Sequence, residues 1–334
     1  MSQKKHVRFI VNPISGINEK ESVVKAVEET IDREKYDFSI LSTLYAGHAE
    51  EIARMAANEG VDIVAAVGGD GTINEVGRAL AHTETAMAVV PCGSGNGLAR
   101  HLRIPINPVR AVKVINEGQE EKIDYGIIDE HPFFCTCGVG FDAFVSLKFA
   151  NSGKRGILSY LENALRESVS YSPETYEIEN SEGTVKYKAF LITCANASQY
   201  GNNAFIAPHA SLTDGLMDIT VLEPFSVIDV PTLSYQLFNK TIDQNSRIKT
   251  MRDTKITIRR AHGGVLHYDG DPVMGGKTIE VEIVHQGLKV IVPNPNDASE
   301  PITPSSILQH ITEFLEVNNE FKPRAERLLR RFRD

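Results

Sequence analysis

The chain has 334 residues, enough for one large domain or two ordinary domains with a buried core. Its apolar fraction of 42% and its charged fraction of 24% are those of a globular protein and argue against a disordered or fibrous one. The formal net charge of −9 argues against a general nucleic-acid binder, because such a protein needs a basic surface to displace phosphate counterions.

The four cysteines predict reduced thiols rather than a zinc site or a disulfide framework, because none is in a CxxC pair. They are Cys92, Cys135, Cys137 and Cys194. No apolar run approaches the roughly 20 residues of a transmembrane helix. Arg8 and Asn12 interrupt the N-terminal segment too early for a signal peptide. We therefore expect a cytoplasmic protein.

The first part of the chain alternates short β-rich runs with helical patterns. The expected strands cover residues 7–11, 38–42, 61–67 and 86–90. Helix-forming residues with an apolar spacing near 3.6 cover residues 19–33, 48–58 and 73–81. This alternation predicts right-handed βαβ units, and hence a doubly wound parallel sheet between helices.

The pattern changes after about Asp124. Strand-like runs cover residues 131–137, 185–194, 217–222, 254–259 and 278–292. Turn residues at 180–183 and at Gln286-Gly287 indicate antiparallel hairpins, and helical insertions are expected near 158–169 and 226–238. We predict an α/β domain over 1–124, a mainly antiparallel β domain over 125–298, and a helical tail over 299–334 that packs back on the first domain.

The most informative segment is a buried strand followed by Gly68-Gly-Asp-Gly-Thr-Ile-Asn-Glu75 and a helix. Phosphates bind at helix N-termini, and glycines allow the backbone to approach them closely. The segment lacks the lysine of a Walker A loop, and Asn74 replaces the third glycine of a dinucleotide fingerprint. Asp70 would repel a polyphosphate unless a divalent cation lies between them. Alternatively, Asp70 simply caps its helix.

Two further loops of small residues follow predicted strands. One is Asn12-Pro-Ile-Ser-Gly16, and the other is Pro91-Cys-Gly-Ser-Gly-Asn-Gly97, which precedes helical residues 98–102. Carboxyl ends of parallel strands meet at one edge of a sheet, where α/β proteins bind ligands. The three loops together predict a phosphate-binding edge.

These motifs resemble the catalytic domain of diacylglycerol kinases, sphingosine kinases and bacterial lipid kinases. The resemblance continues through residues 138–142 (Gly-Val-Gly-Phe-Asp), 207–215 and Asp269-Gly-Asp271, and so covers nearly the whole chain. It implies an NAD kinase/diacylglycerol kinase-like fold with an α/β nucleotide domain and a β-rich lipid domain. It also implies an ATP- and Mg²⁺-dependent kinase that phosphorylates a lipid hydroxyl, with a diacylglycerol-like substrate favoured.

The resemblance also implies site residues by motif position. ATP would contact Asn12, Pro13, Ile14, Ser15, Gly16, Thr43, Gly68, Gly69, Asp70, Gly71, Thr72, Ile73, Asn74, Ser94 and Asn96. A structural Mg²⁺ would be held by Ser211, Asp214 and the backbone at Leu216. Asp271 would be the catalytic base, with Asp269 beside it and Asp70 at the metal-bound phosphates.

This chain departs from the family pattern at two positions. Most relatives have Asp-Gly-Glu where this chain has Asp269-Gly-Asp271, so the acid here is one methylene shorter. Many bacterial members have Asn-Asp where this chain has Asn96-Gly97. The sequence Gly-Ser-Gly-Asn at 93–96 is instead similar to that of sphingosine kinases. A sphingoid base or ceramide is therefore an alternative substrate.

Other readings remain open from the residues alone. Asp-Gly is a preferred hairpin dipeptide, so Asp269 and Asp271 are also explained by a turn. An NAD kinase and a nucleotide-binding module without catalysis are the competing functions. The basic tail 322–334 suits an anionic membrane surface, which would give peripheral membrane association, or else it is a solvated helix on the first domain. Relatives are often homodimers.

Overall fold

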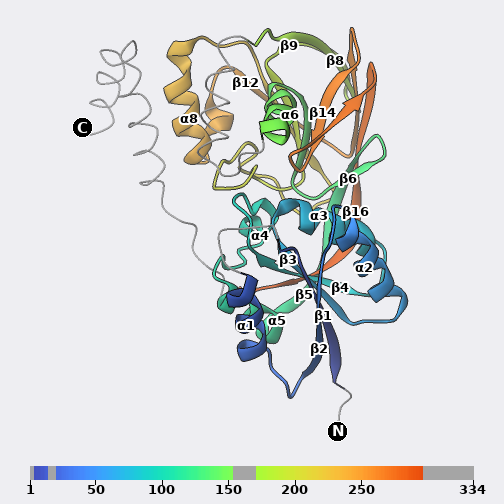
Figure 1. Ribbon diagram of the computed structural model, residues 1–334. Coiled ribbons are helices and arrows are strands. Elements are labelled where there is room, and N and C mark those ends of the chain that lie inside the picture. The colour runs from blue at the N-terminus through green and yellow to red at the C-terminus, as the bar shows by residue number, and fades with distance from the viewer. Residues whose placement is uncertain (1–3, 14–19, 153–170, 296–334) are drawn as a thin grey trace, which may run out of the picture.

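The computed structural model describes residues 4–13, 20–152 and 171–295. Its two halves, an α/β part and a β-sandwich, lie one above the other (Figure 1). The predicted helices at 158–169 and 299–334, and the predicted ATP contacts Ile14, Ser15 and Gly16, lie outside the described residues.

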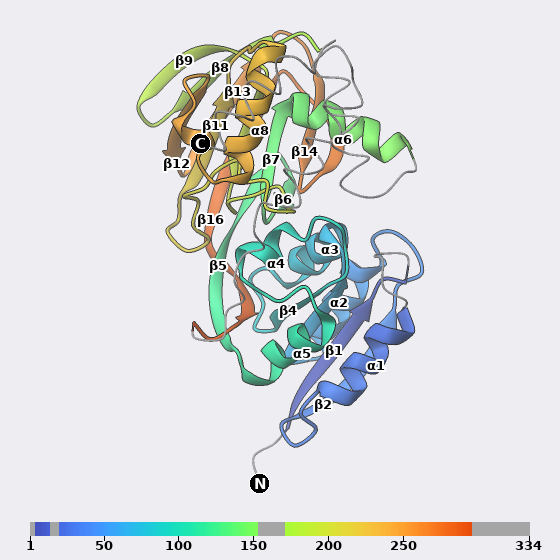
Figure 2. The same ribbon diagram turned by 90° about the vertical axis from the view of Figure 1, so that its left-hand side faces the viewer.

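The N-terminal part alternates strands and helices, as the sequence predicts. Its elements are β1 (Lys5–Val11), α1 (Lys20–Thr30), β2 (Tyr36–Ser42), α2 (His48–Asn58), β3 (Ile63–Gly68), α3 (Asp70–Leu80), β4 (Ala86–Pro91), α4 (Gly97–His101) and α5 (Pro108–Glu117). The strands β2-β1-β3-β4 are adjacent in that order and parallel. Helices α1 and α5 cover one face of the sheet, and α2 and α3 cover the other (Figure 2). The predicted doubly wound sheet is confirmed.

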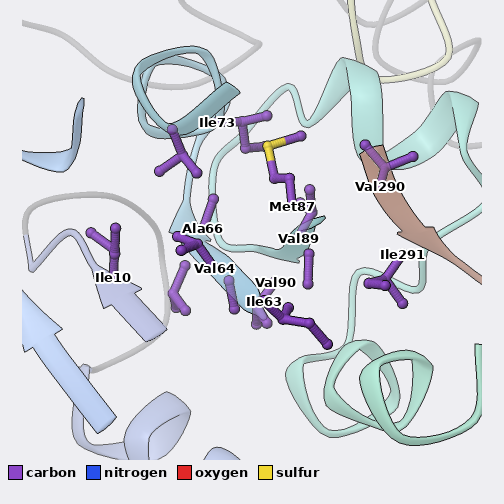
Figure 3. Packing of buried hydrophobic residues seen from close by; sticks show 14 of the residues in the cluster. Ile10, Ile63, Val64, Ala66, Ile73, Met87, Val89, Val90, Val290 and Ile291 are labelled. Carbon is purple, nitrogen blue, oxygen red and sulfur yellow. The ribbon is translucent and has the colours of Figure 1, made fainter. Parts of the chain in front are cut away.

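The core of this part lies around its two central strands. Every residue of β3 and β4 is buried, as expected of parallel strands that are covered by helices on both faces. Helix α3 contributes Ile73, which lies beside Met87 of β4 in Figure 3. Val290 and Ile291, from the far end of the chain, lie in the same cluster next to β4 (Figure 3). The N-terminal core is therefore completed by a strand that comes last in the described chain.

The rest of the chain is mostly antiparallel. Its elements are β5 (Gln119–Ile128), β6 (His131–Phe133), β7 (Thr136–Gly140), α6 (Phe141–Ser152), β8 (Glu174–Asn180), β9 (Gly183–Ala189), β10 (Leu191–Ala195), β11 (Met217–Leu222), η1 (Val227–Asp229), α8 (Val230–Phe238), η2 (Ile242–Gln244), β12 (Ile248–Asp253), β13 (Lys255–Arg260), β14 (Gly264–Tyr268), β15 (Asp271–Gly275) and β16 (Thr278–Val292).

Two sheets of the described residues form the sandwich. One is the N-terminal sheet itself, which continues beyond β4 through β16, β13, β8 and β9, with β5 on the other side of β16. The second has the order β12-β11-β10-β7-β14-β15. Their inner faces share one apolar cluster, which includes Ile256 and Ile279 from the first sheet and Val139 and Ile219 from the second. The predicted antiparallel second domain is confirmed.

Strands β5 and β16 extend through both halves of the molecule. They pair from Gln119↔Val292 to Ile128↔Val281. The expected domain boundary after residue 124 thus falls inside β5. Among the described helices, none is both long enough and apolar enough to span a bilayer.

Several predicted elements need correction. The run 131–137 is two strands, β6 and β7, and the run 185–194 is also two, because β9 belongs to the first sheet and β10 to the second. The predicted hairpin turn at Gln286-Gly287 is wrong, because β16 continues through it with a bulge between Val284 and Leu288. Gln286 adopts a φ of 51° there and donates its N–H to the Asp124 carboxylate at 2.7 Å. The turn residues thus form a bulge.

Candidate active site

Four loops, one after each of the parallel strands β1 to β4, meet at the carboxyl edge of the sheet. Asn12, directly after β1, donates its side-chain amide to Thr72 Oγ1 at 3.0 Å. Thr43, directly after β2, donates its N–H to the last carbonyl of β1 at 2.9 Å. Cys92, after β4, donates its N–H to the Gly68 carbonyl at 2.8 Å. The structure thus gathers the loops in which the sequence predicts phosphate contacts.

The two glycine loops after β3 and β4 touch each other directly. A Cβ on Gly93 would lie 2.6 Å from Gly69 Cα, and a Cβ on Gly95 would lie 2.7 Å from Asp70 Oδ2. Gly71, in contrast, is exposed and has open space where its Cβ would be. Gly93 and Gly95 are therefore required by the contact between the loops, while Gly71 leaves the backbone accessible to a ligand.

Asp70 joins these two loops. It is the first residue of α3, so the helix is capped by Gly69 and not by Asp70. The Asp70 carboxylate accepts the N–H of Gly97 at 2.7 Å and that of Asn96 at 2.9 Å, both at the start of α4. Burial raises the pKa of Asp70, and these two N–H groups act in the opposite direction. Asp70 therefore caps the neighbouring helix, an alternative that the sequence does not suggest.

Asn96 orders the second loop from within. It adopts a φ of 52°, is almost fully buried, and accepts the Gly93 N–H at 2.9 Å with its side-chain oxygen. Its side-chain amide donates to the Gly93 carbonyl at 2.7 Å. Ser94, between them in sequence, is exposed. Of the two predicted ATP contacts in this loop, Ser94 is the one whose side chain a ligand can reach.

Asp269 lies in the turn between β14 and β15. Asp269 and Gly270 both have positive φ, 47° and 90°, and Tyr268 pairs with Asp271, which is a two-residue hairpin of the Asp-Gly kind. The turn reading of this motif is thus correct for the backbone. The sequence could not show that the same turn contacts the N-terminal part of the molecule.

The Asp269 carboxylate is fully engaged with N–H groups. It accepts Asn74 Nδ2 and Phe134 N, each at 2.8 Å, on one oxygen. The other oxygen accepts Cys135 N at 2.8 Å and Thr136 N at 3.1 Å. Burial raises the pKa of Asp269, against the effect of these donors. Asp269 therefore fastens the hairpin to α3 and to the loop before β7.

Asp271 begins β15 and is exposed. Crowding by protein atoms raises its pKa, as do the charges of Asp269, Glu75 and Asp70, while Arg78 lowers it. Asp271 is thus the accessible carboxylate of this acidic group, next to the helix that follows the first glycine loop.

The remaining predicted ATP contacts differ in how far their side chains are exposed to solvent. Pro13 is exposed, whereas Thr43 and Thr72 are buried at the loop junction. Ile73 lies in the core. Asn74 is also buried, and its side-chain amide donates to the Pro132 carbonyl at 3.1 Å. Ile73 and Asn74 therefore support the loop, and among the predicted ATP contacts that the structure describes, Pro13, Gly71 and Ser94 are the exposed residues.

Two charged residues of α3, Glu75 and Arg78, belong to the candidate site although no sequence motif assigns them a role. Glu75 accepts the N–H groups of Gly47 at 2.8 Å and Ala49 at 3.0 Å, and so holds the start of α2 next to the Thr43 loop. Arg78 pairs with Glu50 at 3.0 Å and lies near Asp271. Its spacing could have identified Arg78, because it follows Asn74 by four residues and therefore lies on the same face of α3.

The predicted structural Mg²⁺ ligands occupy a loop before β11. The Asp214 carboxylate accepts the Leu216 N–H at 3.1 Å and forms an ion pair with Arg252. Ser211 Oγ lies 3.3 Å from the N–H of Thr213, which donates to it. As arranged here, these residues do not fit a divalent cation.

Two family models match consecutive parts of the chain. The diacylglycerol kinase catalytic domain matches residues 6–128, and the YegS C-terminal NAD kinase beta sandwich-like domain matches residues 135–292. The matched ranges follow the α/β part and the sandwich of the structure.

Individual proteins agree with these matches. The diacylglycerol kinase of Bacillus subtilis is 25% identical over 89% of this chain and 99% of its own, and that of Mycobacterium tuberculosis is 28% identical over 79% and 88%. A crystal structure of a diacylglycerol kinase from Bacillus anthracis shares the fold, with a TM-score of 0.70 over 89% of this chain and 99% of its own, at 20% identity. The chain therefore belongs to the lipid kinase family that is defined by the diacylglycerol kinase catalytic domain.

Proposed function

We propose that this protein transfers the γ-phosphate of ATP to a hydroxyl group of a membrane lipid, with a diacylglycerol-like acceptor favoured. The main support is the position of Asp271, an accessible carboxylate on a hairpin that Asp269 fastens to α3. The same helix begins at the first glycine loop. Acceptor and donor would thus meet where the two halves of the molecule are joined.

The α3 N-terminus is the proposed site for the triphosphate. Gly69 has no side chain with which to cap the helix, so the first N–H groups of α3 and the positive end of its dipole can face an anion. Exposed Gly71 and Ser94 border this point from the two glycine loops. We place the β- and γ-phosphates here, and we assign Asn12 and Thr43 to shaping the loop junction beside them.

Asp271 is the proposed base. Phosphoryl transfer depends mostly on positioning and on charge stabilisation, because its transition state is loose and negatively charged. Asp271 would orient the lipid hydroxyl and accept its proton as the bond to phosphorus forms. General-base help of this kind contributes a factor of ~10²–10⁴ to the rate.

Magnesium would enter with the nucleotide. Asp70 and Asp269 are engaged with N–H groups, so the described residues offer few free oxygens, and most ligands would be phosphate and water oxygens. When bound, the ion would offset the negative charge of the triphosphate. The protein's own part is to hold the phosphates at α3 and the acceptor at Asp271.

A sphingoid base or ceramide is the alternative lipid, and NAD⁺ the alternative outside lipids. We also propose that the protein works in the cytoplasm at the membrane surface, and the tail 322–334 that would assist there lies outside the described residues.

A lipid panel tests the function directly. The protein is incubated with γ-labelled ATP, Mg²⁺ and mixed micelles of diacylglycerol, sphingosine or ceramide, with NAD⁺ as a separate acceptor. We expect labelled lipid with diacylglycerol, and far less with Asp271→Asn. Labelling of NAD⁺ alone, or of no acceptor, would overturn the proposal, and labelling of sphingosine in preference to diacylglycerol would overturn the choice of lipid.

A further inference from the structure

The loop of residues 211–216 is attached to the rest of the protein on two sides. On its inner side, the Leu212 carbonyl accepts the Asp124 N–H at 2.6 Å, and the Gly215 N–H donates to the Asp124 carboxylate at 2.7 Å. Asp124 is fully buried, and its other oxygen accepts the N–H of Gln286 at the β16 bulge. The loop is therefore tied to the strand pair that runs through both halves of the molecule.

On its outer side, the loop is held by an arginine. Arg252 of β12 lies directly across from Asp218 of β11 in the strand register. Its Nε donates to Asp218 at 3.2 Å, and its terminal nitrogen donates to Asp214. One guanidinium thus bridges a carboxylate of the loop and a carboxylate of the strand that follows it. A planar fork with several donors suits this bridging, which a lysine could not reproduce.

The contacts of Asp214 argue against a divalent cation at the 211–216 loop. Asp214 uses one oxygen for the Leu216 N–H and the other for Arg252. A Mg²⁺ ion needs several oxygen ligands at short distance and would lie next to the positive guanidinium. The two carboxylates that Arg252 bridges are partly shielded from water, because the side chains of Asp214 and Asp218 are 32% and 15% exposed.

We propose that the Arg252 guanidinium takes the place of a divalent cation at Asp214, so that the 211–216 loop is held by the protein's own charges. Asp218 and Asp214 are the two carboxylates it bridges, and Asp124 holds the loop from the other side. The nucleotide-free fold is then independent of Mg²⁺, and the reaction needs only the Mg²⁺ that accompanies ATP.

The test uses the full chain without nucleotide. Free Mn²⁺ is measured by electron paramagnetic resonance during titration into the wild type and into Asp214→Asn, and thermal unfolding is measured in EDTA and in excess Mg²⁺. We expect the two proteins to bind equal amounts of Mn²⁺, and the wild type to unfold at the same temperature in both buffers. Any Mn²⁺ bound at the acidic group around Asp271 is common to both proteins and cancels.

A matched pair of variants tests the role of the arginine. Arg252→Met removes the bridge, and Arg259→Met is the control, because Arg259 is equally exposed, at 43%, and also pairs with two carboxylates, Glu177 and Glu179. We expect Arg252→Met to lower the melting temperature by about 2–4 °C more than the control does.

Two results would overturn the proposal. One is a Mn²⁺ ion that the wild type binds and Asp214→Asn does not, together with a wild type that is more heat-stable in Mg²⁺ than in EDTA. The other is an equal loss of stability in Arg252→Met and Arg259→Met. Should Arg252→Met fail to fold, the Mn²⁺ titration of wild type and Asp214→Asn still decides the question.

Discussion

Asn74 of α3 donates its side-chain amide to the Asp269 carboxylate at 2.8 Å, although the two residues are 195 positions apart in the chain. The same amide donates to the Pro132 carbonyl. This contact places the hairpin that carries Asp271 against the helix that follows the first glycine loop.

Asp269→Asn should destabilise the fold. Each carboxylate oxygen accepts two N–H groups, so an amide in either orientation leaves two donors without an acceptor. We expect a loss of at least about 1–3 kcal/mol in the free energy of unfolding, measured with urea. Asp271→Asn removes the same charge from the same hairpin and is the control. Equal stability of the two variants would contradict the fastening role of Asp269.

Asp271→Asn should reduce turnover while leaving nucleotide binding intact. We expect kcat for lipid phosphorylation to fall by a factor of ~10²–10⁴ because the base is lost. The affinity for an ATP analogue, measured by calorimetry, should stay within about twofold, since the proposed role of this side chain is to act on the acceptor. Asp271→Glu keeps a carboxylate and should retain more activity than Asp271→Asn. A folded Asp271→Asn protein with wild-type turnover would show that another group accepts the proton.

Arg78→Met should shift the pH dependence of the reaction. Asp271 must be ionised to act as a base, and its pKa is already raised by crowding and by neighbouring carboxylates. Arg78 lowers that pKa, so its removal raises it further, and activity should be lost at a higher pH on the acid side. The measurement is the profile of kcat/KM against pH, which reports groups of the free enzyme.

The control for this shift is Arg54→Met. Arg54 pairs with the same Glu50 as Arg78 does, but from within α2. The Arg54→Met variant should lose activity at the same acidic pH as the wild type. An unchanged profile in Arg78→Met, or the same shift in both variants, would remove Arg78 from any influence on the base.

Gly95→Ala should separate the two glycine loops. The new Cβ would lie 2.7 Å from Asp70 Oδ2, so the carboxylate must move away from the N–H groups of Asn96 and Gly97. We expect the free energy of unfolding to fall by about 1–3 kcal/mol, together with weaker nucleotide binding. Gly71→Ala has open space within the first turn of α3 and should not lower the free energy of unfolding. Similar destabilisation in both would mean that the loop contact is not what requires glycine.

Glu75→Gln should loosen the start of α2. The carboxylate accepts two N–H groups there, and the amide can accept with only one oxygen. By analogy with other helix caps, we expect a loss of about 0.5–2 kcal/mol in unfolding free energy. Because the Thr43 loop leads into this helix, KM for ATP should rise more than kcat falls. A change in kcat alone would place Glu75 at the chemistry instead.

The sequence predicts the α/β part well because its signals are local. The continuous apolar runs of β3 and β4 and the spacing of Ile73, Val76 and Leu80 in α3 each follow from neighbouring residues. The apolar spacing predicts that α3 starts at residue 73, whereas it starts at Asp70. A glycine-rich turn and a glycine-rich first turn of a helix look alike in sequence, so the sequence does not show where the helix begins.

Long-range contacts decide what the sequence could not show. Gln286-Gly287 reads as a hairpin turn, yet the buried Asp124 carboxylate binds the Gln286 N–H and keeps β16 in one strand. Likewise, Asp214 has the residue type of a metal ligand, and only its approach to Arg252 shows that a cation of the chain already occupies its oxygen. In both cases the partner is distant in sequence, and no local pattern identifies it.

The long pairing of β5 with β16 through both halves of the molecule limits how the enzyme can respond to its substrates. A rotation of the sandwich against the nucleotide-binding half would have to bend this ribbon, and every ladder bond along it resists such bending. The ladder is interrupted only between Val284 and Leu288, where Asp124 again anchors the backbone. We therefore expect adjustment to ATP and to a lipid to come from small shifts of surface loops, because Asp269 also fastens the β14–β15 hairpin to α3. This strand pair thus predicts an enzyme that binds its substrates without a large rotation of one half against the other, unlike kinases that close by a movement of two lobes.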